Sequence, residues 1–213
     1  MMTKNKCRDR SYGFTLFELM VVMGVVAVIA VLAVPAFNSV QRSSALTRGE
    51  EEVLGELNLA RQHALSVNRD VEVRFYRYKD GVVPGNPSQF RSVQSFVYSD
   101  SGEASPIRMM RNLPPTVVID AGTVLSSILV PARRKNWLGS DIQPPLPGLN
   151  KDYEAYAFRF RPDGGTDLAP FPGTPWFITL HDRAAGDSLS APPDNYTSIV
   201  VDPINGQPSS YRP

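Results

Sequence analysis

Residues 13–37 read GFTLFELMVVMGVVAVIAVLAVPAF, an almost unbroken apolar run with one carboxylate, Glu18, near its start. The 19 residues from Leu19 to Phe37 carry no formal charge. As a helix they span roughly 29 Å, which is close to the hydrocarbon thickness of a bilayer. A carboxylate in a membrane segment is costly and usually has a function. The run therefore predicts a membrane helix whose single charge needs its own explanation.

A basic prefix precedes the run. It contains four cations and one acid, namely Lys4, Lys6, Arg8, Arg10 and Asp9. By the positive-inside bias, the N-terminus stays in the cytoplasm and the rest of the chain crosses the membrane. A secretory signal peptide cut near Ala36 is one alternative, although its apolar region is usually only about 7–15 residues long. A plain single-span anchor is another, and neither explains Glu18.

The hexapeptide GFTLFE, Gly13 to Glu18, resembles the cleavage and methylation motif of type IV prepilins and type II secretion pseudopilins. The resemblance implies that a prepilin peptidase cuts between Gly13 and Phe14 on the cytoplasmic side, and then N-methylates Phe14. Residues 1–13 are in that case a leader peptide. Glu18 becomes the fifth mature residue and Pro35 the twenty-second, where the family has its glutamate and often a helix-kinking proline.

The same resemblance gives Glu18 and Pro35 roles in assembly. Cleavage creates a new α-amine on Phe14, and in a packed bundle of such helices the carboxylate of one subunit can pair with the amine of its neighbour. Pairing offsets the desolvation of both charges, and the family is thought to use it to set axial register. Pro35 lacks an N–H and should bend or locally melt the helix.

Hydrophobic periodicity extends the helix beyond the apolar run. Residues 14–37 form the transmembrane or fibre-core part, and residues 38–69 have an amphipathic pattern that predicts one helix to about residue 68. Glu52 and Glu56 fall on its polar side. The residues predicted to pack on the head are Leu46, Val53, Leu57, Ala60 and Ala64.

From residue 70 the apolar period changes to two, which predicts a β-rich globular head over residues 70–213. In the first strand, Val71, Val73 and Phe75 alternate with Glu72, Arg74 and Tyr76, as expected for a half-buried strand. Further strands are predicted within 92–102, 115–120, 156–165 and 176–182, followed by a hairpin over 196–211. The fold class is therefore α+β, a long N-terminal helix packed on a small antiparallel β-sheet.

The order of these elements resembles the minor pilins and minor pseudopilins of the FimT/GspH type. The resemblance rests on LNLARQHALSVNRDVEV (57–73), FRFRPDGG (158–165) and the final IVVDPINGQ (199–207). It implies a pilin-like fold for most of the chain. The proline-rich stretch at about 131–151 departs from it and is predicted to be an inserted surface loop.

The sequence contains no recognisable group of catalytic residues. The two histidines, His63 and His181, lie on different elements, and no nucleophile, phosphate-binding or dinucleotide-binding motif is present. His181 could meet Asp182 or Asp163. The segment from Asp163 to Asp167 lacks the alternating ligands of a calcium loop. We therefore predict a protein that is not an enzyme, with no cofactor and no metal site.

One basic patch has the chemistry of a binding site. Arg133, Arg134 and Lys135 stand beside Trp137, and cations beside an indole can hold phosphates and stack a base. Some FimT-like minor pilins are associated with DNA uptake, so DNA or ligand binding here is the alternative function. Removing the four basic and one acidic residues of the leader from 22 and 21 leaves 18 and 20. This net charge of −2 argues against bulk nucleic-acid binding.

Together these features predict a structural subunit, a minor pilin or pseudopilin of a type IV pilus or a type II secretion pseudopilus. It is expected in the bacterial inner membrane with a single pass, a cytoplasmic N-terminus and a periplasmic or extracellular head. The expected partners are other pilins or pseudopilins, prepilin peptidase and membrane lipid. The sequence does not distinguish a pilus, a secretion system and a competence system.

Overall fold

The computed structural model describes residues 13–79, 87–137, 143–144, 146, 152–170, 173 and 175–213, without the side chains of residues 32–36 and 38. The chain divides into two compact units, Met1–Gln41 and Arg42–Pro213.

Helix α1, Leu16–Val67, contributes to both units and confirms the long helix predicted from the sequence. The helix is continuous through position 35. The backbone therefore does not show the local melting that was predicted there as an alternative to a bend. In the first unit its large apolar side chains are exposed, among them Phe17, Met20 and Ile29. No helix within the described residues is long and apolar enough to cross a membrane.

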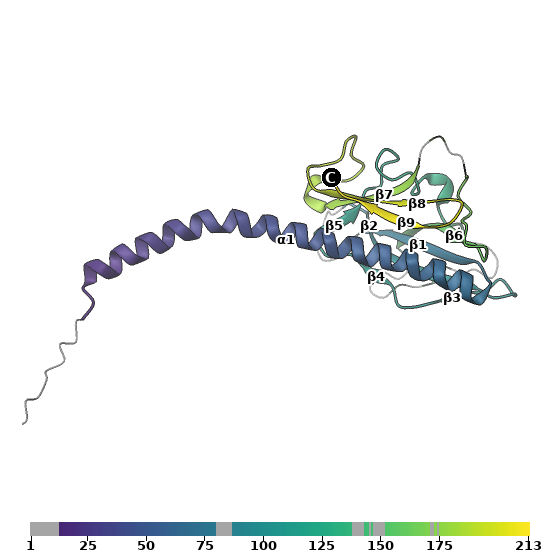
Figure 1. Cartoon of the computed structure of the whole chain (residues 1–213), viewed down its shortest axis with the longest axis horizontal. Coiled ribbons are helices and arrows are strands. Elements are labelled where there is room, and N and C mark those ends of the chain that lie inside the picture. The colour runs from purple at the N-terminus through teal and green to yellow at the C-terminus, as the bar shows by residue number, and fades with distance from the viewer. Residues whose placement is uncertain are drawn as a thin grey trace, which may run out of the picture. The chain divides into compact units, whose positions relative to one another are not determined.

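The second unit is an antiparallel sheet packed on the C-terminal half of α1 (Figure 1). Within the described residues its strands are β1 (Val71–Tyr78), β2 (Gln89–Tyr98), β3 (Ala104–Pro106), β4 (Arg111–Asn112), β5 (Val117–Ile119), β6 (Tyr153–Phe160), β7 (Trp176–Asp182), β8 (Tyr196–Val201) and β9 (Pro208–Tyr211). The order along the sheet is β6-β1-β2-β5-β7-β8-β9, and β3 and β4 also pair with β2. This arrangement confirms the α+β class and every strand region predicted from the sequence.

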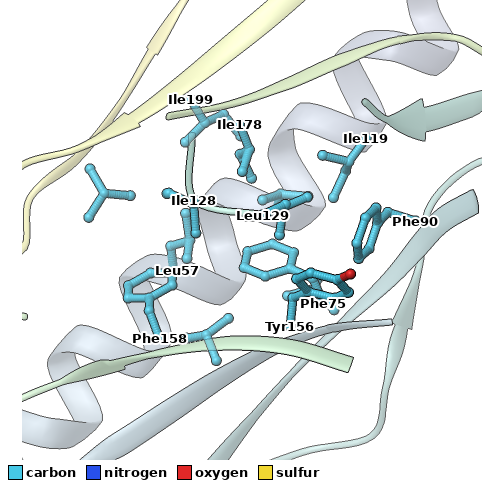
Figure 2. Packing of buried hydrophobic residues seen from close by; sticks show 14 of the residues in the cluster. Leu57, Phe75, Phe90, Ile119, Ile128, Leu129, Tyr156, Phe158, Ile178 and Ile199 are labelled. Carbon is cyan, nitrogen blue, oxygen red and sulfur yellow. The ribbon is translucent and has the colours of Figure 1, made fainter. Parts of the chain in front are cut away.

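The main core lies between α1 and the sheet. All five helix positions predicted to pack on the head are buried. In Figure 2, Leu57 of α1 lies among Phe75 and Phe158 from neighbouring strands. Burying a side chain of this size contributes roughly 1.5–3 kcal/mol. A Cβ on Gly49 would lie 3.0 Å from Val117 Cγ1, so this glycine lets the helix approach β5 closely.

Glu56 was predicted on the polar side of the helix, and this prediction is wrong. Its side chain is fully buried and paired with Arg108, while Glu52 lies 3.6 Å from Arg111. Both arginines belong to the segment around β3 and β4. Because these two strands are only three and two residues long, the sequence pattern did not reveal the segment that covers this side of the helix.

Strand β1 is buried on both faces, not half-buried as predicted. Glu72 and Arg74 expose 3% and 1% of their surface, and Tyr76 is fully buried. A second apolar cluster on this outer face explains the burial, because Leu146 and the partly buried Trp137 pack there. The cluster consists of Tyr76, Phe96, Leu146, Tyr153 and Ala155.

Residues 131–137 lie along the free edge of β6. They begin with a single 3-10 turn, η1 (Pro131–Arg133). Arg134 then forms a bridge with Tyr156, and the Lys135 N–H donates to the Ala155 carbonyl at 2.7 Å. These pairings satisfy an otherwise open strand edge. Most of the predicted insertion, residues 138–142, 145 and 147–151, lies outside the described residues.

Candidate functional site

The predicted cleavage site lies just before α1. Gly13 and Phe14 precede the first helical residue, and both are exposed, with 81% of the Phe14 surface accessible. Exposed segments outside regular structure are the preferred substrates of proteases. Residues 1–12, which make up almost all of the predicted leader, lie outside the described residues.

Glu18 forms a capping box with Thr15 at the start of α1. The Thr15 backbone N–H and hydroxyl each donate to Glu18 Oε2 at 3.0 Å. In return the Glu18 N–H donates to the Thr15 hydroxyl at 3.2 Å. This reciprocal pattern satisfies donors that the first turn of a helix leaves unpaired. The signal T-x-x-E was present in the sequence but was not used in the prediction.

The cap uses only one of the two oxygens of the Glu18 carboxylate. Both bonds that Thr15 donates end on Oε2, and Oε1 has no hydrogen-bond partner within the described residues. One oxygen therefore holds the helix start, while the other stays available to a cation from outside the subunit. For Pro35, the other predicted assembly residue, the side chain lies outside what the structure describes.

The three cations of the basic patch are paired with acids of the same head. Arg133 Nη1 lies 2.8 Å from Asp167 Oδ2, and its Nη2 donates to the Asp167 carbonyl at 3.0 Å. Arg134 lies 2.8 Å from Glu154. The patch that the sequence predicts as a possible DNA- or ligand-binding site is therefore a set of internal contacts.

Lys135 belongs to a network centred on the buried Glu72. Its Nζ lies 3.0 Å from Glu72 Oε1, Arg74 Nε donates to the same oxygen at 2.6 Å, and Arg159 Nε donates to Oε2 at 3.1 Å. The Tyr98 hydroxyl also donates to Oε2, at 3.0 Å. One carboxylate thus holds three cations and leaves a local surplus of positive charge.

The electrostatics of this network follow from its burial and its pairs. Burial alone would raise the pKa of Glu72, but Arg74 and Lys135 outweigh it and hold the pKa below its ordinary value. Burial likewise opposes the charge of Arg159, but Glu72 raises the pKa of its guanidinium above the ordinary value. Glu72 and Arg159 are therefore both charged at neutral pH.

Trp137 does not lie open as a stacking platform. Its ring is 5.0 Å from the guanidinium carbon of Arg74 and makes an edge contact with Tyr153 at 6.3 Å. The guanidinium carbon of Arg74 also lies 3.9 Å from the centre of the Phe96 ring. The indole therefore covers a buried cation, a contact that contributes to stability.

The two histidines lie on different elements of the second unit, α1 and β7. His63 is partly buried on α1, whereas His181 is fully buried and faces Asp120, with Nε2 and Oδ2 3.2 Å apart. The expected contact with Asp182 exists only through its carbonyl oxygen. Asp163 caps a turn by accepting from the Gly165 N–H at 2.8 Å. Among the described residues no group of three or more His, Cys, Asp or Glu could hold a metal ion.

Comparison with known protein families gives a match at the N-terminus of the chain. Residues 8–34 match the family described as the prokaryotic N-terminal methylation motif. No curated protein matches the chain. The chain therefore carries the prepilin methylation signal that GFTLFE suggested.

Two solved structures resemble the chain at low identity. The minor pseudopilin EpsH from the type 2 secretion system of Vibrio cholerae is 12% identical, with 79% of this chain and 97% of that chain covered and a TM-score of 0.43. The type IV minor pilin FimU of Pseudomonas aeruginosa is 14% identical, with 79% and 92% covered and a TM-score of 0.41.

Proposed function

We propose that this chain, which carries a prokaryotic N-terminal methylation motif at residues 8–34, is the precursor of a non-enzymatic pilin or pseudopilin subunit. In the proposed organisation, residues 1–13 are a leader and 14–37 anchor the subunit in the membrane and then in the fibre. Residues 38–69 join this part to the head, 70–213. The mature subunit is a minor component of a type IV pilus or a type II secretion pseudopilus.

The observation that carries the proposal is the junction between leader and helix. The matched motif includes the Gly13–Phe14 bond, which is exposed and lies outside α1. A peptidase can therefore reach the bond without unfolding the helix. Cutting there keeps Thr15 and Glu18 in the mature chain, so the capping box survives maturation.

Assembly through the helix is supported by what the first unit leaves exposed. Its apolar side chains have no partner in the described structure, and Glu18 Oε1 is available beside them. Apolar surface of this extent marks an interaction site. Packing of helices from several subunits would bury this surface, and the Phe14 amine of one subunit would meet the Glu18 carboxylate of the next.

The membrane location is the part of the proposal that rests on sequence. The uncharged run from Leu19 to Phe37 has the length of a bilayer span, and four cations precede it. We expect a single pass through the bacterial inner membrane, with the head outside the cytoplasm. Protease added to spheroplasts should then digest the head, whereas a cytoplasmic marker protein stays intact.

The nucleic-acid alternative at Arg133, Arg134, Lys135 and Trp137 has weaker support. Each cation of this patch is paired with an acid of the head, and Trp137 covers Arg74. A phosphate would have to displace these pairs. The observations therefore favour the structural subunit over a DNA-binding one.

A leader-processing assay with a matched glycine variant tests the proposed maturation. Gly13→Val should retain the leader when a prepilin peptidase is co-expressed, because the branched side chain stands at the cut bond. Gly24→Ala changes a glycine in the same apolar run and should be processed like the wild type. Equal processing of the Gly13→Val and wild-type chains would exclude cleavage at Gly13.

A further inference from the structure

A pocket of about 390 Å³ lies on the head where residues 132–136 run beside β6. All of its lining residues are described, and all belong to the second unit. Its lining includes Ala157 and Phe158 of β6. The pocket therefore does not depend on the N-terminal helix or on how the two units are placed.

The walls of the pocket are charged, with a surplus of cations. Five basic and three acidic side chains line it: Arg133, Arg134, Lys135, Arg159 and Arg161, and Asp70, Glu72 and Asp167. The surplus is two positive charges. A concave site with a surplus of one sign of charge raises the local concentration of ions of the opposite sign, so the ligand it favours is an anion.

The cations that line the pocket differ in how exposed they are and in how far their own pairs occupy them. Arg133 and Lys135 are largely buried in their pairs with Asp167 and Glu72. Arg159 uses its Nε for Glu72, and its side chain is 39% exposed. Its two terminal nitrogens have no hydrogen-bond partner within the described residues.

Arg161 is the cation with the most freedom to bind. It is exposed, and its side chain makes no hydrogen bond or ion pair with any described residue. It stands two residues after Arg159, and both line the same pocket. Arg134 adds a third guanidinium, 56% exposed, whose own partner Glu154 lies outside this pocket. Guanidinium groups present planar pairs of donors that match a carboxylate.

We propose that this pocket binds the carboxylates of an acidic segment of a partner protein, held between Arg159 and Arg161 with Arg134 at the rim. The inference deepens the proposed function, because it names the chemistry of a neighbour that docks on the head. A carboxylate suits the site better than a polyphosphate chain, since Asp70, Glu72 and Asp167 on the walls would repel a dense line of charge.

The test measures binding of a labelled hexaglutamate peptide to the full chain in detergent by fluorescence anisotropy. Arg161→Gln should weaken binding about tenfold, because charge-assisted hydrogen bonds are lost. Arg48→Gln is the matched control, since Arg48 is also exposed and makes no ion pair with any described residue. It removes the same charge and should stay within about twofold of the wild type. Arg161→Lys, which keeps the charge without the planar fork, should fall between the two.

Three outcomes would overturn the proposal. In the first, Arg161→Gln and Arg48→Gln would have equal affinities, and in the second, hexaglutamate would bind no better than hexaglutamine. In the third, oligothymidylate would displace hexaglutamate and bind more tightly in an Arg161-dependent way, which would assign the pocket to nucleic acid. Leader processing of Arg161→Gln, followed in parallel, should stay normal, so a failure of this inference is distinguishable from a failure of the proposed maturation.

Discussion

His181 Nε2 lies 3.2 Å from Asp120 Oδ2, and both side chains are fully buried. The other ring nitrogen faces the Asp182 carbonyl at 2.9 Å, which can only accept. Asp120 also accepts from the backbone N–H groups of Gly122 and Leu189 at 2.7 and 3.0 Å. This pair therefore joins β7 to the segment that follows β5, and Asp120 also holds the segment at Leu189, so the role of the pair is structural.

Removing Asp120 should be strongly destabilising. Asp120→Ala leaves the His181 ring and two backbone donors without their acceptor in a buried site, so we expect a loss of about 3–5 kcal/mol in the free energy of unfolding. Urea denaturation of the full chain in detergent measures this loss. His63→Ala, on the partly exposed face of α1, should change stability by less than about 0.5 kcal/mol. Similar losses in both variants would contradict the role given to Asp120.

Glu72 should be the most sensitive charge of the head. Glu72→Gln keeps the shape but removes the negative charge that Arg74, Lys135 and Arg159 share, and turns one acceptor oxygen into a donor, so it should cost about 3–5 kcal/mol. Asp100→Asn removes the acid of an exposed pair with Arg69 and should cost about 0–1 kcal/mol. An equally small loss in Glu72→Gln would show that the network does not hold the outer face together.

The same carboxylate predicts a dependence on pH. The pKa of Glu72 in the folded protein is lowered from its ordinary value of 4.5, so its stabilisation is present above 4.5 and is lost as the pH falls through the lower, folded value. The stability difference between the wild type and Glu72→Gln should therefore be constant near neutrality and shrink below about pH 4.5. Urea midpoints measured from pH 7 to pH 3 check this. A difference that stays constant to pH 3 would contradict it.

Glu18 is expected to have two separable roles, in the cap and in assembly. Thr15→Val removes the hydroxyl of the capping box but keeps the Glu18 carboxylate, whereas Glu18→Gln removes the charge. If the carboxylate meets the amine of a neighbour, Glu18→Gln should lower incorporation into sheared fibres at least tenfold. Thr15→Val should lower it only slightly, since a lost cap costs about 1 kcal/mol. Equal losses would mean that Glu18 acts only as a cap.

The turn of the terminal hairpin depends on Gly206. Its φ is +65°, a region that disfavours side chains, and a Cβ there would collide with the Gly164 carbonyl oxygen. Gly206→Ala should therefore destabilise the head by about 1–3 kcal/mol. Gly55→Ala is the control, because a Cβ at Gly55 meets nothing within 4 Å and alanine favours helix. Thermal unfolding should show the first variant less stable and the second at least as stable as the wild type.

Periodicity was sufficient to predict the architecture. The helix, its buried positions from Leu46 to Ala64 and the strand regions all follow from local patterns of period 3.6 or 2. The two strands missed, β3 and β4, are too short to show a period. They also explain why Glu56, which looks solvent-facing in the sequence, is buried against Arg108.

The charged network could not be predicted in the same way. Glu72 and Lys135 are 63 positions apart, and only the fold brings them within 3.0 Å. The sequence showed three consecutive cations but not the acids that face them from β1, β6 and the turn after β6. The capping box at the N-terminus could have been predicted, because Thr15 and Glu18 are only three positions apart and form a local sequence pattern.

The central claim is maturation at the Gly13–Phe14 bond, and the mass of the N-terminal peptide tests it most directly. The protein is extracted from membranes of cells with and without a co-expressed prepilin peptidase. We predict a peptide that begins at N-methylated Phe14 only when the peptidase is present. A leader retained in both samples, or a cut near Ala36, would contradict the account.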